Sequence, residues 1–268
     1  MRRSLSAMTD EIVLYTTENK IATIALNQPD SRNALSDTLL DALIAAFERA
    51  RDDEEVGCVV LASTHETVFS AGGDLGGFAE ELTAEQRYER LARFPALFEL
   101  IGTLGKPTIC AARGHVLAGS LGIALACDLV LAADTAKFIE VFIRRGIAPD
   151  AGGAWLLTRL VGIQKAKELF FLGDDVPALE AERIGLVNRV VPAAELHAET
   201  AALAARLAAA PTRAIAITKA ITNRALDVDR STALLDEAWG QELVTTTHDM
   251  IEGISAFVER RDPQFRGW

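Results

Sequence analysis

The chain has few cysteines, and their placement excludes two kinds of structure. Only three occur, Cys58, Cys110 and Cys127, and each lies inside an apolar run. None of the spacings matches that of metal ligands, and no even-numbered disulfide framework is available. We therefore expect reduced core thiols in a cytoplasmic protein.

Long uninterrupted apolar runs are also lacking. The most apolar segment, residues 116–133, is interrupted by Gly119, Gly122 and Asp128, which suits a buried segment better than a membrane span. Residues 1–10 contain two arginines but no long apolar stretch follows them. We expect neither a signal peptide nor a membrane partner.

Positive charge is scarce. The formal net charge is -11, which argues against non-specific binding of nucleic acids. An anionic ligand would have to be met by a local basic cluster. Half of the 268 residues are hydrophobic, so the chain can build one large core with a helical appendage.

Strand and helix patterns alternate through the first two thirds of the chain. We expect strands at residues 12–16, 21–26, 58–62, 108–112 and 129–132, and helices following Ser36 and at residues 85–101 and 119–127. Pro95 predicts a break or kink in the second of these helices. This alternation indicates an α/β fold with crossover connections.

The pattern changes after Val191, where only helices are expected. They cover residues 195–209, 211–223, 233–244 and 250–260. We divide the chain into a core at 1–205 and a C-terminal helical oligomerisation region at 206–268. Helices with apolar faces and little core of their own often pack against other subunits.

Two glycine-containing loops can direct backbone N–H groups at a ligand. They are Val68-Phe69-Ser70-Ala71-Gly72-Gly73-Asp74-Leu75 and Gly114-His115-Val116-Leu117-Ala118-Gly119-Ser120-Leu121. Small residues allow close approach to the backbone, and a helix that begins in the loop leaves N–H donors unpaired. Neither loop fits the patterns that bind phosphates or dinucleotides.

Together with their surroundings these loops resemble the enoyl-CoA hydratase/isomerase (crotonase) superfamily. The resemblance covers nearly the whole chain, and is carried by residues 27–35, 69–75, 106–128, 149–153, 185–187 and 251–268. It implies a spiral of ββα units followed by a helical trimerisation region. It also implies a homotrimer or hexamer, an acyl-CoA thioester as substrate, and no metal or redox cofactor.

The resemblance further implies that two backbone amides stabilise a thioester enolate. Carried over by position, they belong to Gly73 and Gly119. Related hydratases also use two glutamates, whose positions correspond to Gly122 and Phe142 in this chain. Neither residue can transfer a proton, so the resemblance argues against hydration by the usual route.

Asp150 resembles the catalytic aspartate of isomerases in the superfamily. The match is closest to the ring-isomerising enzyme of bacterial phenylacetate degradation, which also has phenylalanine where Phe142 lies. One carboxylate can remove a proton and return it at another carbon. The alternative is that Asp150 caps the following helix. Burial beside Phe142 and Trp155 would raise its pKa, whereas capping would lower it.

Other polar residues near these motifs are weaker candidates. Strand alternation puts Glu140 on the same face as Phe138 and Phe142, and we expect it to be exposed or salt-bridged rather than catalytic. His65 and His115 have no visible carboxylate partner and are expected to be structural or to line a wall.

The remaining expected substrate contacts come from several segments. They are Arg32, Ala34, Ala71, Asp74, Leu75, Phe142, Trp155, Phe257 and Arg260. In relatives, positions resembling Arg32, Phe257 and Arg260 contact CoA, the last two across a subunit boundary. A solvated surface arginine is the alternative, as is a capping role for Asp74 and a core role for the apolar residues.

The sequence thus predicts an acyl-CoA isomerase with Asp150 as base. A hydratase or hydrolase that uses Asp150 to activate water is a second hypothesis. A third, of another class, is a catalytically silent acyl-CoA-binding protein that kept the backbone donors and lost the acids.

Overall fold

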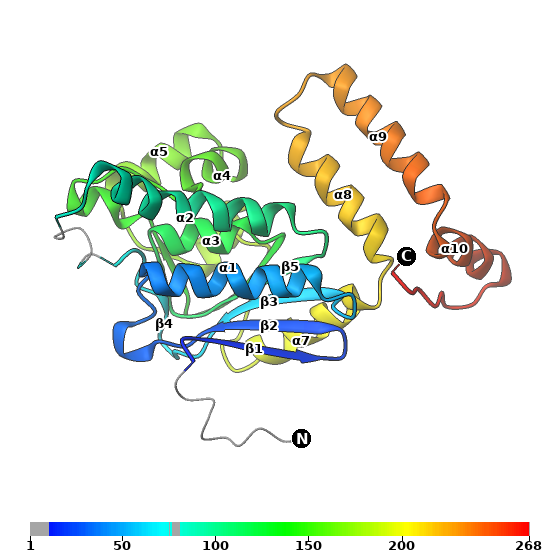
Figure 1. Ribbon diagram of the computed structural model, residues 1–268, viewed down its shortest axis with the longest axis horizontal. Helices are drawn as coiled ribbons and strands as arrows, with labels where there is room; N and C mark the ends of the chain where they lie inside the picture. The colour runs from blue at the N-terminus through cyan, green and yellow to red at the C-terminus, as the bar shows by residue number, and fades with distance from the viewer. Residues whose placement is uncertain (1–10, 75, 77–80, 268) are drawn as a thin grey trace.

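A computed structural model describes residues 11–74, 76 and 81–267 (Figure 1). The larger of its two sheets has the strand order β1-β2-β3-β5-β7-β10. β1 (Val13–Glu18) and β2 (Ile21–Leu26) form an antiparallel hairpin. The other strands continue in parallel, and are β3 (Cys58–Ser63), β5 (Thr108–Ala112), β7 (Leu129–Ala133) and β10 (Arg189–Val191).

The smaller sheet has the order β4-β6-β8-β9. Its strands are β4 (Val68–Ser70), β6 (His115–Leu117), β8 (Lys137–Ile139) and β9 (Val176–Pro177). Each of β3, β5 and β7 is followed at once by a strand of the smaller sheet and then by a helical segment. The expected α/β fold of repeated ββα units is confirmed, and the repeat aligns β4, β6 and β8 side by side.

Both faces of the larger sheet are buried, as expected for parallel strands. Alternate residues of β3 point to opposite sides, so Val59 and Leu61 join one core while Cys58 and Val60 join the other. α1 (Asp37–Asp52), α2 (Ala84–Thr103) and α3 (Gly119–Ala126) form the layer over the first core, and α7 (Leu196–Ala208) covers the second. All three cysteines are buried free thiols.

The helix α2 corrects one prediction. It runs without a break from Ala84 to Thr103, with Pro95 inside it. A capping box between Thr83 and Gln86 secures its start, and Phe94, Leu97 and Ile101 anchor it in the core. This packing outweighs the hydrogen bond that proline removes.

Three shorter helices follow the last ββα unit. They are α4 (Gly153–Leu160), α5 (Ile163–Leu172) and α6 (Ala178–Arg183), and two single 3₁₀ turns lie at Pro29–Ser31 and Val141–Arg145.

The C-terminal helices extend away from the core (Figure 1). They are α8 (Thr212–Arg224), α9 (Arg230–Thr245) and α10 (His248–Glu259). Their large exposed apolar side chains are Leu234, Leu235, Trp239, Leu243, Ile251, Ile254, Phe257 and Val258. Within the described residues, no helix combines the length and the hydropathy that a membrane crossing requires.

Candidate active site

The smaller sheet gathers three loops at one edge. β4 pairs with β6 in parallel, and β6 pairs with β8, with Leu117 opposite Ile139. The carboxyl ends of parallel neighbours lie together, and ligands of α/β sheets commonly bind there. The chain leaves these three ends at Ala71, Ala118 and Glu140, so the two glycine loops meet at this edge.

The two glycine loops are in direct contact. Gly72 has φ +81°, and a Cβ on it would lie 2.8 Å from the Leu117 oxygen and 3.0 Å from the Ala118 Cβ. Only glycine allows this approach. Ser120 Oγ also donates to the Ser70 carbonyl at 3.4 Å, which ties α3 to the end of β4.

The backbone on either side of Gly73 is hydrogen-bonded to Leu35, and the N–H of Gly73 points away from that residue. Leu35 N donates to the Gly72 oxygen at 2.8 Å, and Asp74 N donates to the Leu35 oxygen at 3.4 Å. Groups alternate along extended backbone, so the Gly73 N–H lies on the opposite side from Leu35. It has no acceptor within the described part of the chain.

Gly119 offers a second N–H, because it is the first residue of α3. Ala118 precedes it with φ 49° and ψ -126°, a conformation unusual for a residue with a side chain. Its own N–H is held by the Ile139 oxygen at 2.9 Å. Strained backbone of this kind often occurs at functional sites. In the described residues the Gly119 N–H also lacks an acceptor.

Asp150 lies beside Gly119. Its Oδ1 is 3.2 Å from the position that a Cβ on Gly119 would occupy, and it is buried without a hydrogen-bond partner among the described residues. Ala151 (φ 51°) and Gly152 (φ 75°) form a tight turn in which Gly153 N donates to the Asp150 carbonyl at 3.0 Å. This turn aims the carboxyl group at α3.

The capping alternative for Asp150 is wrong. Gly152 is the N-cap of α4, and no side chain caps this helix. Burial raises the pKa of Asp150 to about 6, with its own backbone N–H opposing that rise. The carboxyl group is therefore mostly ionised at neutral pH and protonated in mild acid.

Glu140 corrects the prediction of an exposed or salt-bridged residue. Its side chain is 2% exposed, and both carboxyl oxygens lack a hydrogen-bond partner in the described structure. Burial, and then the charge of Asp150, raises the pKa of Glu140 to about 8. Gly153 in α4 and Phe170 in α5 enclose its carboxyl end. The site thus holds two buried acids rather than one.

A cavity of about 370 Å³ opens beside these groups. Gly73, Asp74 and Asp150 line it together with Leu91 and Phe94 of α2. Two arginines of the same helix also reach its wall, Arg87 and Arg90, and the latter is paired with Asp37 at 3.1 Å. Apolar walls with a few polar groups are typical of ligand sites.

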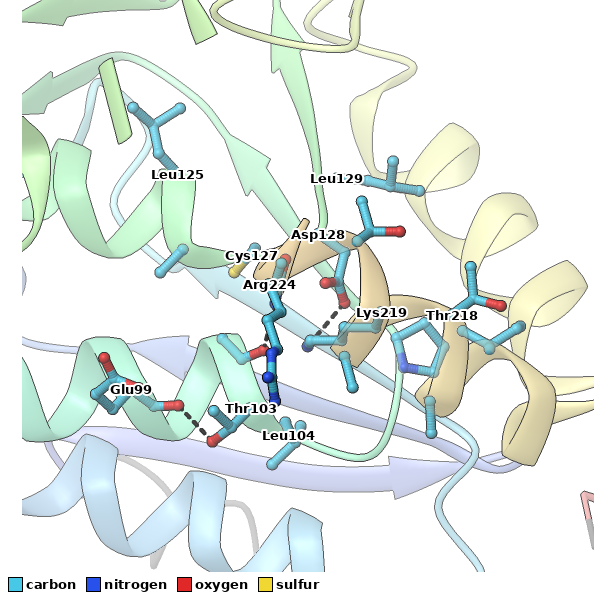
Figure 2. A pocket seen from close by; sticks show the side chains of 18 of the residues that line it. Glu99, Thr103, Leu104, Leu125, Cys127, Asp128, Leu129, Thr218, Lys219 and Arg224 are labelled. Atoms are coloured by element: carbon cyan, nitrogen blue, oxygen red, sulfur yellow. Dashed lines mark hydrogen bonds and ion pairs between the residues drawn. The ribbon is translucent and has the colours of Figure 1, made fainter. Parts of the chain in front are cut away.

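A larger cavity of about 950 Å³ lies between α8 and the core, and Figure 2 shows it. Lys219 and Asp128 form an ion pair inside it at 3.0 Å. Trp155 lines this second cavity, with its ring 6.0 Å from that of Phe98. Its walls contain neither Gly73 nor Asp150. We place the candidate site in the smaller cavity because Gly73 and Asp150 line it, and Gly119 lies next to Asp150.

Residues 27–35 pack against the first glycine loop. Ala71 N, in that loop, donates to the Arg32 carbonyl at 2.9 Å, which brings Arg32 and Ala34 next to it. Asn33 is fully buried here, and its amide donates to the Phe69 carbonyl at 3.0 Å and to Ser63 Oγ at 2.9 Å. Sequence reasoning did not single out Asn33, which stands between Arg32 and Ala34 and gives no local signal of burial.

Four further predicted residues fall in other places. Phe142 is buried, 5% exposed, in the turn after Glu140. Phe257 is 85% exposed on α10, and Arg260 ends that helix; neither lines the cavity that contains Asp150. Leu75 lies outside the described residues.

Of the two positions that correspond to hydratase glutamates, Gly122 is closed to such a side chain. A Cβ on Gly122 would lie 2.2 Å from the Ala151 carbonyl oxygen. The turn that presents Asp150 therefore occupies the space that a side chain at residue 122 would need. His65, by contrast, is structural as expected, since its Nδ1 accepts from Thr67 N and Val68 N.

Comparison with known proteins shows what the whole chain is similar to. A family model described as enoyl-CoA hydratase/isomerase matches residues 16–267. A crotonyl-CoA hydratase of Syntrophomonas wolfei is 36% identical over 261 residues, covering 96% of this chain and 99% of that protein. A short-chain-enoyl-CoA hydratase of Clostridium acetobutylicum is 36% identical over 258 residues, covering 93% and 95%. The solved structure of an enoyl-CoA hydratase from Bacillus anthracis has a TM-score of 0.91 at 31% identity, covering 96% and 100%.

Proposed function

Because this chain belongs to the enoyl-CoA hydratase/isomerase family, we propose that it moves the double bond of an enoyl-CoA thioester, with Asp150 as the proton-transfer base. The relatives support an acyl-CoA enzyme, and the choice of isomerisation is ours. One observation carries it: the carboxyl group of Asp150 lies against Gly119, whose N–H has no acceptor in the described structure.

In this proposal the thioester oxygen accepts hydrogen bonds from the N–H groups of Gly73 and Gly119. Asp150 removes a proton from the carbon next to the carbonyl, and the electron pair delocalises into a dienolate. The neutral Asp150 then returns the proton at the far end of the conjugated system, so nothing is gained or lost. Each preorganised donor typically lowers such a barrier by about 3 kcal/mol.

The charge state of Asp150 suits a base that works in both directions. With a pKa of about 6 it is ionised at neutral pH, yet it holds a proton readily once the enolate forms. An ordinary aspartate has a lower pKa, so it is a weaker base and removes the proton from carbon less readily. Burial is the cause of this tuning.

Hydration by two glutamates has no room at this site. Any side chain at Gly122 would collide with Ala151, and Phe142 carries no acid. A second candidate is nevertheless favoured by one observation, since Glu140 provides another buried acid beside Asp150. A hydratase could use this different pair, and the names of the relatives favour that reaction.

The test uses a 3-enoyl-CoA and a 2-enoyl-CoA of the same chain length, in water and in deuterium oxide. We expect interconversion of the two, with deuterium entering the shifted system to the extent that the neutral Asp150 exchanges its proton with solvent before returning it. Formation of 3-hydroxyacyl-CoA faster than isomerisation would favour the hydratase. Binding of the thioester with neither interconversion nor deuterium entry would leave only an acyl-CoA-binding protein.

We propose further that α8, α9 and α10 mediate a homotrimer or a dimer of trimers. The support is the row of exposed apolar side chains, among them Trp239 and Val258, which are 63% and 72% exposed. In such an assembly Phe257 and Arg260 would meet the CoA of a neighbouring subunit. Light scattering of the purified protein would contradict this proposal by showing a monomer.

A further inference from the structure

Behind Asp150 lies an acid that the proposed reaction does not use. Glu140 follows β8, whose last residue is fixed by the bond from Ala118 N to the Ile139 oxygen at 2.9 Å. The hydrogen bond that holds the second glycine loop at Ala118 therefore also holds the backbone next to Glu140. Its side chain is buried, and it does not line the cavity of Asp150.

The two carboxyl groups flank one turn. Asp150 is its first residue and Gly153 its last, and Glu140 Oε1 lies 3.4 Å from the position of a Cβ on Gly153. Asp150 Oδ1 and both oxygens of Glu140 are buried with no hydrogen-bond partner among the described residues. Buried polar atoms left without partners are rare, and each one calls for a physical reason.

The surroundings of Glu140 decide its charge. Asp150 is the one ionisable group whose charge acts on it in the described structure. α4 presents Gly153 and α5 presents Phe170, both without charge. Arg144, in the turn after Glu140, is directed to Asp174 and Asp175 at 3.8 Å instead. No cation compensates Glu140, so beside an ionised Asp150 it keeps its proton.

We propose that Glu140 is a positioning residue for Asp150, a neutral acid whose O–H serves the inner oxygen Oδ1 through one bridging water. This inference rests on the proposed function, since it assigns a role to the residue behind the proposed base. The O–H satisfies Oδ1 and stabilises the ionised form of Asp150. The second oxygen of Asp150 is then left to face the substrate.

The decisive pair of variants is Glu140→Gln and Glu140→Leu. Glutamine keeps a neutral donor of the same shape, whereas leucine fills similar space without one. For each, kcat/KM is measured from pH 4.5 to 9. We expect the acid limb of the kcat/KM profile, which reports the pKa of Asp150, to stay within about 0.3 pH units of the parent in Glu140→Gln. Glu140→Leu should move that limb up by about one unit and lower kcat at pH 7 about tenfold.

Other outcomes overturn the proposal in different ways. A downward shift in both variants would mean that Glu140 acts as a second negative charge. Equal loss in both would mean that Glu140 itself transfers a proton. Unchanged limbs in both would leave only a packing role.

A second measurement is independent of turnover. Infrared titration of the protonated carboxyl bands, assigned by subtracting spectra of Asp150→Asn, gives the midpoint of Asp150 in each variant. We expect the midpoint of Asp150 to rise by about one pH unit in Glu140→Leu and to stay unchanged in Glu140→Gln. If that shift is found in a protein that turns over no enoyl-CoA, the inference stands and the proposed reaction falls.

Discussion

Two clusters of charged side chains in this molecule are built in opposite ways. Asp128 accepts from Thr108 N at 2.7 Å, from Thr108 Oγ1 at 2.9 Å and from Lys219 at 3.0 Å. Lys219 also donates to the Ile101 carbonyl at 2.9 Å. Glu140 and Asp150 retain carboxyl oxygens with no partner in the described residues.

The difference separates a structural role from a chemical one. Around Asp128 the charges are compensated, and the result is that α8 is fixed to the core (Figure 2). Around Asp150 the charge is left uncompensated, which raises its pKa and keeps it reactive. The comparison predicts that substitutions in the first cluster alter stability, and substitutions in the second alter chemistry.

The largest effect is expected for Asp150→Asn. The amide has the same shape but cannot accept a proton, so kcat should fall by about 10³-fold while CoA binding holds and the melting temperature does not fall. Asp74→Asn, at an exposed carboxylate of the same cavity, is the matched control and should change KM more than kcat. Turnover near the parental rate in Asp150→Asn would remove it from the mechanism.

The second cluster should respond in stability. Lys219→Met leaves Asp128, which is partly exposed to solvent, with Thr108 but without its cation, and we expect the free energy of unfolding to fall by about 2 kcal/mol. The control is Lys165→Met, which breaks a surface pair with Glu168 and should cost less than about 0.5 kcal/mol. Urea titrations measure both. Equal losses of unfolding free energy would show that the Lys219–Asp128 pair stabilises the fold no more than the surface pair does.

Much of the fold could be predicted because local patterns and tertiary packing agree. Strand 21–26 and the helix capped by Ser36 match β2 and α1. Pro95 misled because its local effect is outweighed by the packing of α2, which the residues around it do not reveal.

The site was harder to predict, since it depends on what packs over each residue. Alternation predicted Glu140 on one face with Phe138 and Phe142, but β8 ends at Ile139 and Phe142 lies in the following 3₁₀ turn, so the strand pattern does not extend to them. The expectation of exposure failed because α4 and α5, from later in the chain, cover Glu140. Trp155 was expected near Asp150, but α4 directs it into the cavity beside Phe98. That the two glycine loops come together could be predicted, because their motifs resemble those of the family.

An intermediate effect is expected for Gly122→Ala, which tests whether the turn of Asp150 and α3 compete for space. Its new Cβ would meet the Ala151 carbonyl oxygen at 2.2 Å, so the turn must move. We expect a loss of about 2 kcal/mol in stability and a reduced kcat. The control is Gly102→Ala in α2, where nothing lies within 4 Å and alanine favours the helix. Unaltered activity in Gly122→Ala would show that the turn tolerates displacement.

The last prediction distinguishes the two acids by the pH dependence of stability, through an effect that is small per pH unit. The pKa of Glu140 rises from 4.5 to about 8 on folding, so within that window the native chain binds a proton that the unfolded chain has released. The parental free energy of unfolding therefore falls as pH rises, by about 1.4 kcal/mol per pH unit at most. Glu140→Gln removes this slope, so its stability relative to the parent should increase with pH. Asp150→Asn should show the same behaviour only up to about pH 6, where the pKa of Asp150 lies. Thermal melts from pH 5 to pH 8 measure both. A stability difference between Glu140→Gln and the parent that does not change with pH would mean that Glu140 is already ionised in the native state. Its charge would then repel Asp150 instead of donating a hydrogen bond to it.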